Sequence, residues 1–160
     1  MRRMVFCAVA MVSIGCAKSH QFTDTSNTVY ALASSYPEIG LFITMTETSE
    51  LDATLRESEP VTVLAPNNRA ISVLGSDRVR FLMSPEGSTE LGELVKVHVF
   101  PGAFSAEDVA RGKLPASLNG NRVAGSKASD GTPRVGGTGR IIESMKGSNG
   151  FLHVIDTVIR

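Results

Sequence analysis

After residue 26, the first part of the sequence places apolar side chains at helical spacing. Asn27 or Thr28 can cap a helix that ends before Pro37, because a residue that precedes proline disfavours the α region. Further apolar residues spaced three or four apart predict more helices; they are Ile39, Phe42 and Ile43, then Leu51 and Leu55, then Leu91, Leu94 and Val95. Between them, the β-branched residues 61–65 predict a strand, which is followed by a loop at Asn67-Asn68.

The second half of the sequence is dominated by turn signals and period-two patterns. Valines at 95, 97 and 99 alternate with other side chains and predict a strand that ends at the Pro101-Gly102 turn. Ser105 predicts the cap of a short helix. Asn119-Gly120, Asp130-Gly131 and Asn149-Gly150 predict tight turns, the first of them within a hairpin between residues 117–118 and 122–123. Residues 151–159 are apolar on both faces, as in a central strand. Residues 125–139, rich in Gly, Ser and Thr, predict an exposed hairpin.

The first sixteen residues have the order of a secretory signal peptide. Arg2 and Arg3 precede residues 4–14, an apolar run that is too short to span a bilayer. Cleavage before Cys16 would leave an acylated cysteine at the new N-terminus, whereas cleavage after Ala17 would discard it. We therefore expect a signal peptide over residues 1–16, a polar tether over residues 17–26 and one domain over residues 27–160. If Cys16 is acylated, its lipid is the expected contact with the membrane.

Charge and cysteine content exclude several classes of function. Lys plus Arg equals Asp plus Glu at 16 each, and loss of Arg2 and Arg3 leaves a net charge of −2. Nucleic-acid binding needs a basic surface, so we expect no nucleic-acid partner. Both cysteines, Cys7 and Cys16, lie in the leader. The domain therefore has no internal disulfide and no thiolate for catalysis or zinc.

Three segments, taken in order, resemble the signatures of the fasciclin family. The first reads Val-Thr-Val-Leu-Ala-Pro-Asn-Asn-Arg-Ala at residues 61–70. The second reads Leu-Val-Lys-Val-His-Val-Phe-Pro-Gly at residues 94–102. The third, residues 148–159, resembles the closing strand of the family, and residues 29–42 resemble its first helices. The resemblance covers residues 27–160 and implies an α+β fold, in which N-terminal helices pack on two small β-sheets that form a wedge.

The same resemblance marks Pro66, Asn68, His98, Pro101 and Gly102 as motif positions, with mostly structural roles. We expect His98 to be hydrogen-bonded to Asn68 or to a nearby backbone group, because a buried unpaired nitrogen is unfavourable. Val97 stands where the family has a tyrosine linked to receptor contact in animal members. Integrin-type adhesion is therefore not expected of this chain.

Catalytic and metal sites find little support in the sequence. His153 and Asp156 are three residues apart on a predicted strand, so their side chains point to opposite faces and cannot pair. His20, His98 and His153 show no metal-binding spacing, and the glycines at 136, 137 and 139 lack the Lys-Ser/Thr of a phosphate loop. No Gly-x-Ser-x-Gly motif occurs. We expect no cofactor, no metal and no enzymatic activity.

The resemblance implies a surface module for adhesion. We expect it to bind a protein or glycan of the envelope, of the matrix or of another cell, as a monomer or with weak self-association. Its expected location is outside the cytoplasm, either as a lipoprotein of the outer membrane or cell surface or as a secreted or periplasmic protein. The alternative is a carrier that holds a small apolar ligand in a cleft between helices and sheets.

Overall fold

The computed structural model describes residues 27–160, so the predictions for residues 1–26, including Cys16, lie outside the described residues. The first half of the described chain is mostly helical. In chain order its elements are α1 (Val29–Ser34), the 3-10 helix η2 (Pro37–Ile39), α2 (Gly40–Thr48), α3 (Asp52–Arg56), β1 (Val61–Pro66), α4 (Asn68–Ser72), α5 (Ser76–Leu82), the 3-10 helix η3 (Pro85–Gly87) and α6 (Ser88–Lys96). Thr28 caps α1, because its side chain accepts a hydrogen bond from the Ala31 amide.

The second half contributes most of the strands, which are β2 (Val99–Pro101), β3 (Gly125–Lys127), β4 (Pro133–Val135), β5 (Gly139–Gly147) and β6 (Gly150–Ile155), with α7 (Ala106–Ala110) after β2. The six strands are ordered β2-β1-β6-β5-β4-β3. Of the strand pairs between residues 27 and 160, only β1 and β6 are parallel, so the sheet is mixed. Because β5 pairs with both β6 and β4, the two small sheets expected from the sequence are continuous. The predicted α+β class is confirmed.

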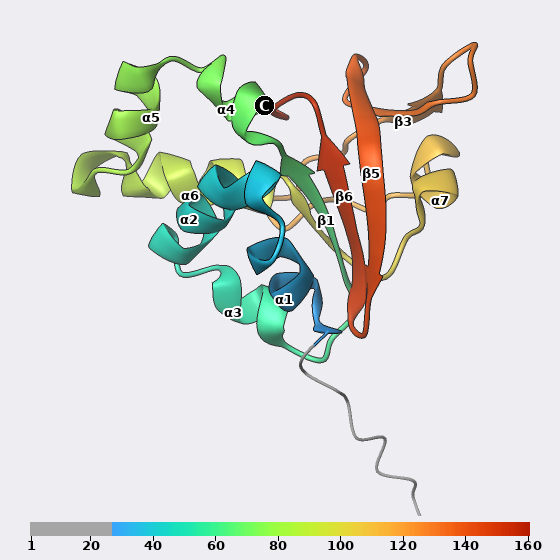
Figure 1. Cartoon of the computed structure of the whole chain (residues 1–160), viewed down its shortest axis with the longest axis horizontal. Helices are drawn as coiled ribbons and strands as arrows, with labels where there is room; N and C mark the ends of the chain where they lie inside the picture. The colour runs from blue at the N-terminus through green and yellow to red at the C-terminus, as the bar shows by residue number, and fades with distance from the viewer. Residues whose placement is uncertain (1–26) are drawn as a thin grey trace, which may run out of the picture.

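The sheet separates two apolar cores. Helices α1 to α6 cover one face, where Val61, Val63 and Val154 pack with residues such as Phe42 and Leu91. The opposite face carries Leu64, Phe100 and Ile155, which α7 and the β3–β4 hairpin cover (Figure 1). Since β6 is buried on both faces, the prediction of a central strand near the C-terminus is confirmed.

Three predicted boundaries are wrong. Val95 lies in α6 and packs in the helix-side core, and the Val97 amide still donates to the Glu93 carbonyl, so β2 begins only at Val99. The predicted loop at Asn67-Asn68 is instead the start of α4, because the Asn67 side chain accepts from the Ala70 amide. The last strand ends at Ile155, and the Asp156 side chain after it accepts hydrogen bonds from the backbone amide and the side chain of Arg140.

The predicted turns are confirmed, although the strands beside the Asn119-Gly120 turn are shorter than expected. Gly120 and Gly131 adopt positive φ angles of 85° and 87°. The Asn119-Gly120 turn is flanked by a single bridge between Ala116 and Arg122 in place of a hairpin. Residues 125–139 do form a mostly exposed hairpin, but Val135 in its second strand is fully buried. The hairpin is therefore also part of the core.

Candidate binding site

His98 lies between α6 and β2 and is fully buried. Its Nδ1 is 2.7 Å from the Leu94 carbonyl oxygen, and its Nε2 accepts a hydrogen bond of 3.0 Å from the Ile159 amide. The imidazole is therefore neutral, with its proton on Nδ1. Burial lowers the pKa of His98 to about 4. The expected backbone partner is confirmed, and the alternative partner, Asn68, is wrong.

Asn68 connects α4 to the segment where η2 meets α2. Its Nδ2 donates to the Pro37 carbonyl at 3.0 Å, and its Oδ1 accepts from the Leu41 amide at 3.0 Å. The Asn68 side chain thus satisfies a free amide at the start of α2, where a helix leaves its first amides unpaired. It also adds a second hydrogen bond to the Pro37 carbonyl, which already accepts from the Gly40 amide. Pro66 ends β1 opposite Ile155. Both motif residues hold helices and sheet together.

The Pro101-Gly102 turn is fixed by a buried threonine on the neighbouring strand. Thr62 donates from Oγ1 to the Gly102 carbonyl at 2.7 Å, and the same oxygen accepts from the Phe104 amide at 2.9 Å. Gly102 has φ of 102° and donates its amide to the Pro60 carbonyl. These hydrogen bonds reverse the chain after β2, so the turn serves the fold.

His153 and Asp156 have separate partners. The Nε2 of His153 donates to the Phe104 carbonyl at 2.9 Å, so its Nδ1 accepts from the Ser144 hydroxyl at 2.8 Å. Burial lowers the pKa of His153 below its usual value. Asp156 forms an ion pair of 2.8 Å with Arg140. As the sequence predicted, these two residues do not pair.

Asn149 is a structural residue that the sequence did not reveal. It is nearly fully buried beneath α1 and α3. Its Oδ1 accepts from the Val29 amide at 2.7 Å, and its Nδ2 donates to the Leu55 and Glu57 carbonyls. The Asn149-Gly150 pair predicted only a turn. The Asn149 side chain also joins the β5–β6 turn to α1 and to the end of α3, which are about a hundred residues or more away in the sequence.

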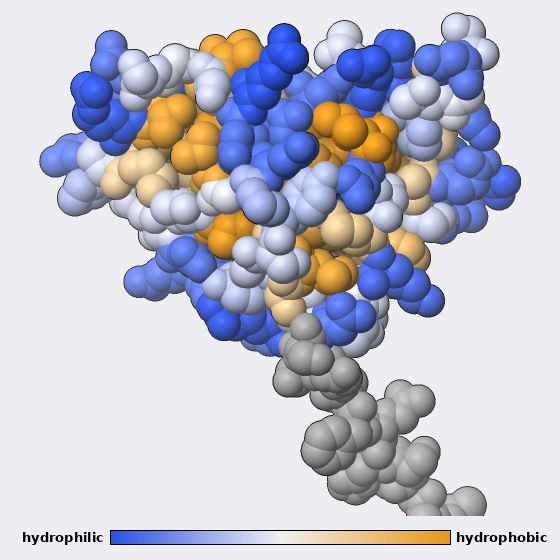
Figure 2. Space-filling view, viewed as in Figure 1, coloured by the Kyte–Doolittle hydropathy of each residue, from blue (hydrophilic) through white to orange (hydrophobic). Residues whose placement is uncertain are grey.

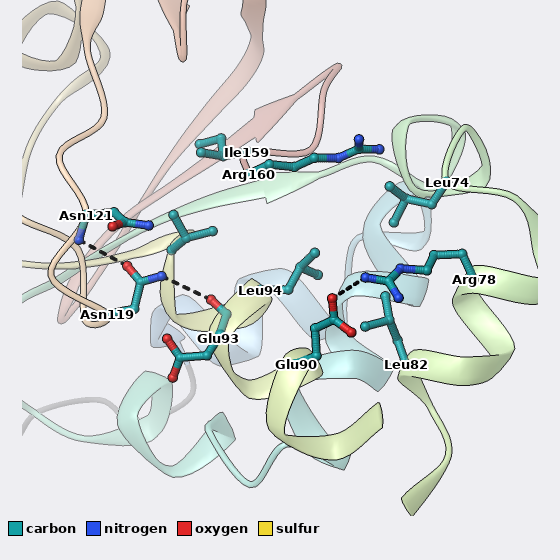
Figure 3. Close-up of a pocket in the computed structure, with 11 residues that line it drawn as sticks. Leu74, Arg78, Leu82, Glu90, Glu93, Leu94, Asn119, Asn121, Ile159 and Arg160 are labelled. Atoms are coloured by element: carbon teal, nitrogen blue, oxygen red, sulfur yellow. Dashed lines mark hydrogen bonds and ion pairs between the residues drawn. The ribbon is translucent and has the colours of Figure 1, made fainter. Parts of the chain in front are cut away.

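A cleft lies between α5, α6, the Asn119-Gly120 turn and the last two residues (Figure 3). Its volume is about 540 Å³, within the usual size of ligand sites. The apolar part of its lining comes from four separate segments: Leu74, Leu82, Leu94, Val97 and Ile159. No single sequence pattern brings these residues together, and the cleft was not predicted beyond the general expectation of a helix–sheet cleft.

Polar side chains line the rest of the cleft. Arg78 on α5 forms an ion pair with Glu90 on α6, and Glu93 pairs with Lys96 at 3.1 Å. At the other end, the Asn119 side chain reaches the Glu93 carbonyl, so the turn is attached to α6. Arg160 extends along the cleft in Figure 3 and forms no ion pair with any residue from 27 to 160.

Apolar side chains are also exposed around this cleft. Figure 2 shows hydrophobic residues at the surface over α4 and α5. Val73 precedes the lining residue Leu74, Phe81 lies beneath the Arg78 guanidinium, and Leu118 precedes the lining residue Asn119. We call these three residues the apolar rim. A solvent-exposed group of large apolar residues beside a cleft is typical of a binding surface.

A profile of the Fasciclin domain matches residues 37–160. The chain belongs to the fasciclin domain family. Protein sll1483 of Synechocystis sp. is 32% identical over 141 residues, which cover 88% of this chain and 77% of that protein. Stabilin-2 of Mus musculus is 35% identical over 77 residues, which cover 46% of this chain and 3% of Stabilin-2.

The fold of this fasciclin domain also matches a solved one. A domain pair from fasciclin I, an insect cell adhesion molecule, superposes with a TM-score of 0.73 at 14% identity. The match covers 84% of this chain and 51% of that chain, so this protein corresponds to about half of the pair. The recognition made from the three sequence segments is thus confirmed, and the domain is of a kind that occurs in a cell adhesion protein.

Two further observations concern the described residues alone. Between residues 27 and 160, no group of three or more His, Cys, Asp or Glu side chains is placed to hold a metal ion. Within the same range, no helix has the length and apolar character needed to cross a bilayer.

Proposed function

We propose that this fasciclin domain is an adhesion module that works outside the cytoplasm and binds a protein or glycan partner through its surface. The observation that carries the proposal is where the motif side chains are directed. The polar groups of Asn68 and His98 form hydrogen bonds with backbone groups inside the domain. The family signature therefore builds a rigid scaffold, and contact with a partner falls to exposed residues. Binding in place of catalysis fits this arrangement.

Crosslinking on intact cells tests this function. The full chain, carrying a photoreactive crosslinker, is incubated with the host's cells and with cells of other origin. We expect saturable capture of a surface component, which excess unlabelled chain displaces. Labelling that rises linearly with concentration, or that unlabelled chain does not displace, would contradict adhesion.

A lipid on Cys16 is the proposed means of attachment to the cell, with residues 17–26 as a tether. The alternative is secretion, or release into the periplasm, after cleavage behind Ala17. Growth with an alkyne-tagged fatty acid distinguishes the two. Wild-type protein should carry the label and Cys16→Ser should not, while an unacylated N-terminus at Lys18 would support release.

We also propose the exposed hairpin formed by residues 125–139 as a contact surface. Deleting it is a poor test, since Val135 is fully buried and would be lost from the core. Substitution at the exposed tip, Ser129→Arg, leaves Val135 in place. Unchanged capture on cells by this variant would exclude the tip as the contact.

A carrier of a small apolar ligand is the second candidate, and the volume of the cleft favours it. Extraction of the native protein with organic solvent, followed by mass spectrometry, tests it. A ligand found in a one-to-one ratio would support the carrier. Its absence, together with saturable capture on cells, would support the adhesion module.

A further inference from the structure

The cleft is continuous with the part of the apolar rim that Val73 forms. A smaller hollow beside the cleft is lined by Val73 and shares Leu74 and Arg160 with it. Val73 is 80% exposed, which is unusual for a large apolar side chain on a well-packed helical corner. A small molecule that filled the cleft would leave this rim in contact with water. A segment of protein can cover both.

The charged side chains at the cleft determine which charge a bound molecule should carry. Three of the four charged side chains that line the cleft have ion-pair partners, because Arg78 pairs with Glu90, and Glu93 pairs with Lys96, which lies outside the lining. Arg160 lines the cleft, and Arg69 lies one turn before Val73 at the rim. Neither forms an ion pair with any residue between 27 and 160. The surface therefore carries unneutralised positive charge and favours an acidic group.

One amide at the far end of the cleft suits a peptide backbone. Asn121 lines the cleft, and within residues 27–160 its side chain makes no hydrogen bond. A carboxamide offers both a donor and an acceptor, as a peptide group requires. An aliphatic chain has nothing to pair with it. This amide and the exposed rim favour a peptide over a fatty acid, whose carboxylate would pair with an arginine equally well.

We propose that the cleft and its apolar rim bind an exposed segment of a partner protein, in which a large apolar side chain enters the cleft and a neighbouring Asp or Glu side chain pairs with Arg160 or Arg69. This inference rests on the adhesion function proposed above, and it narrows the partner from protein or glycan to protein. Apolar anchors that fill pockets commonly supply most of the affinity in such interfaces.

Synthetic peptides test the proposal directly. The full chain, purified in mild detergent, is screened against capped peptides of about six residues, roughly 20 Å when extended. Each peptide contains one Leu or Phe. A nearby position is Asp in the first set of peptides, Ser in the second and Lys in the third. We expect Asp peptides to bind at least about tenfold more tightly than Lys peptides. The double variant Arg69→Glu, Arg160→Glu should reverse this preference. Equal binding of all three sets would overturn the inference.

A second pair of variants separates the surface from general stickiness. Val73→Glu adds a negative charge at the rim and should weaken the binding of Asp peptides by about tenfold. The matched control is Ile142→Glu, since Ile142 is 53% exposed on β5, outside the cleft. Equal effects of the two substitutions would exclude the cleft as the site.

Other occupants give distinct results. A fatty acid that binds one-to-one and is displaced by no peptide would assign the cleft to a lipid. A dimer in analytical ultracentrifugation that Val73→Glu abolishes would assign it to a second copy. Either result overturns this inference alone, provided that cells still capture the chain. Loss of saturable capture by the wild-type chain would overturn the adhesion function itself.

Discussion

Buried polar groups in the interior of the domain have partners within it, whereas groups at the α5–α6 cleft face solvent. In the interior, His98, Thr62 and Asn149 are buried, and each makes two or more hydrogen bonds inside the domain. At the cleft, Val73 is largely exposed and Arg160 has no ion-pair partner between residues 27 and 160. The polar groups of the first region form their hydrogen bonds within the domain, whereas the second region exposes groups that can bind a partner.

This contrast separates what identifies the family from what binds. The motif residues are recognisable because buried hydrogen bonds tolerate few substitutions, as leaving a buried group unpaired costs about 1 to 3 kcal/mol. The cleft residues face solvent, where most substitutions change stability little. A signature of this kind therefore marks the scaffold, and a partner's binding site has to be found from the structure.

The largest effect is expected where β1 meets β6. Gly150 has φ of 146°, and an added Cβ would lie 1.7 Å from the Val61 carbonyl oxygen. Gly150→Ala should therefore separate the two central strands and lower the free energy of unfolding by about 4 kcal/mol or more. Gly137 is the control, since its φ is 85° but nothing lies within 4 Å, and Gly137→Ala should cost about 1 kcal/mol. Similar denaturant midpoints for the two variants would contradict this account.

A pH dependence of stability is expected from His98. Burial lowers its pKa to about 4 from 6.5, so between these values the unfolded chain binds a proton that the folded one does not. Stability is then present above pH 6.5 and is lost as pH falls toward 4, by about 3 kcal/mol over the interval. Urea unfolding as a function of pH measures this loss. His153 shifts in the same direction and adds to it.

The variant His98→Gln isolates that contribution. Glutamine does not titrate, and its oxygen can replace Nε2 as acceptor for the Ile159 amide. The variant should be less stable at neutral pH, but its stability should fall less between pH 6.5 and 4. An unchanged slope would show that His98 is not the group that titrates.

A smaller loss is expected from the turn after β2. Thr62→Val keeps the shape of the side chain but leaves the Gly102 carbonyl and the Phe104 amide without their partner. We expect a loss of about 2 kcal/mol in the free energy of unfolding. Thr62→Ser keeps the hydroxyl and should recover most of this loss. If Thr62→Val is as stable as wild type, the turn does not depend on this hydrogen bond.

Sequence patterns predicted the features of this fold that depend on neighbouring residues. The Thr28 cap, strand β1, the Gly120 and Gly131 turns and the central position of β6 all follow from local spacing, and the ordered motifs gave the family. The start of β2 was misplaced because alternating valines also fit the end of an amphipathic helix. Burial of Val95 against the helices decided between the two.

Local sequence patterns could not predict the candidate site, and the reason is physical. Leu74, Leu94 and Ile159 come from distant parts of the chain, and only the packed fold places them in one cleft. Asn149 shows the same limit, because its hydrogen bond to the Val29 amide joins residues 120 positions apart. An exposed Val73 also has no signal in sequence, since a valine in a helical pattern is read as a core residue.

The smallest effect on stability is expected at the rim, and it completes the comparison. Val73→Glu places a charge on a side chain that is already in water, so the free energy of unfolding should change by less than about 0.5 kcal/mol. The same exchange at Val63, which is fully buried in β1, would leave an unpaired carboxylate in the core and abolish folding. Urea unfolding measures both. If Val73→Glu destabilised the domain by several kcal/mol, the rim would belong to the scaffold, and its exposure would no longer argue for a partner.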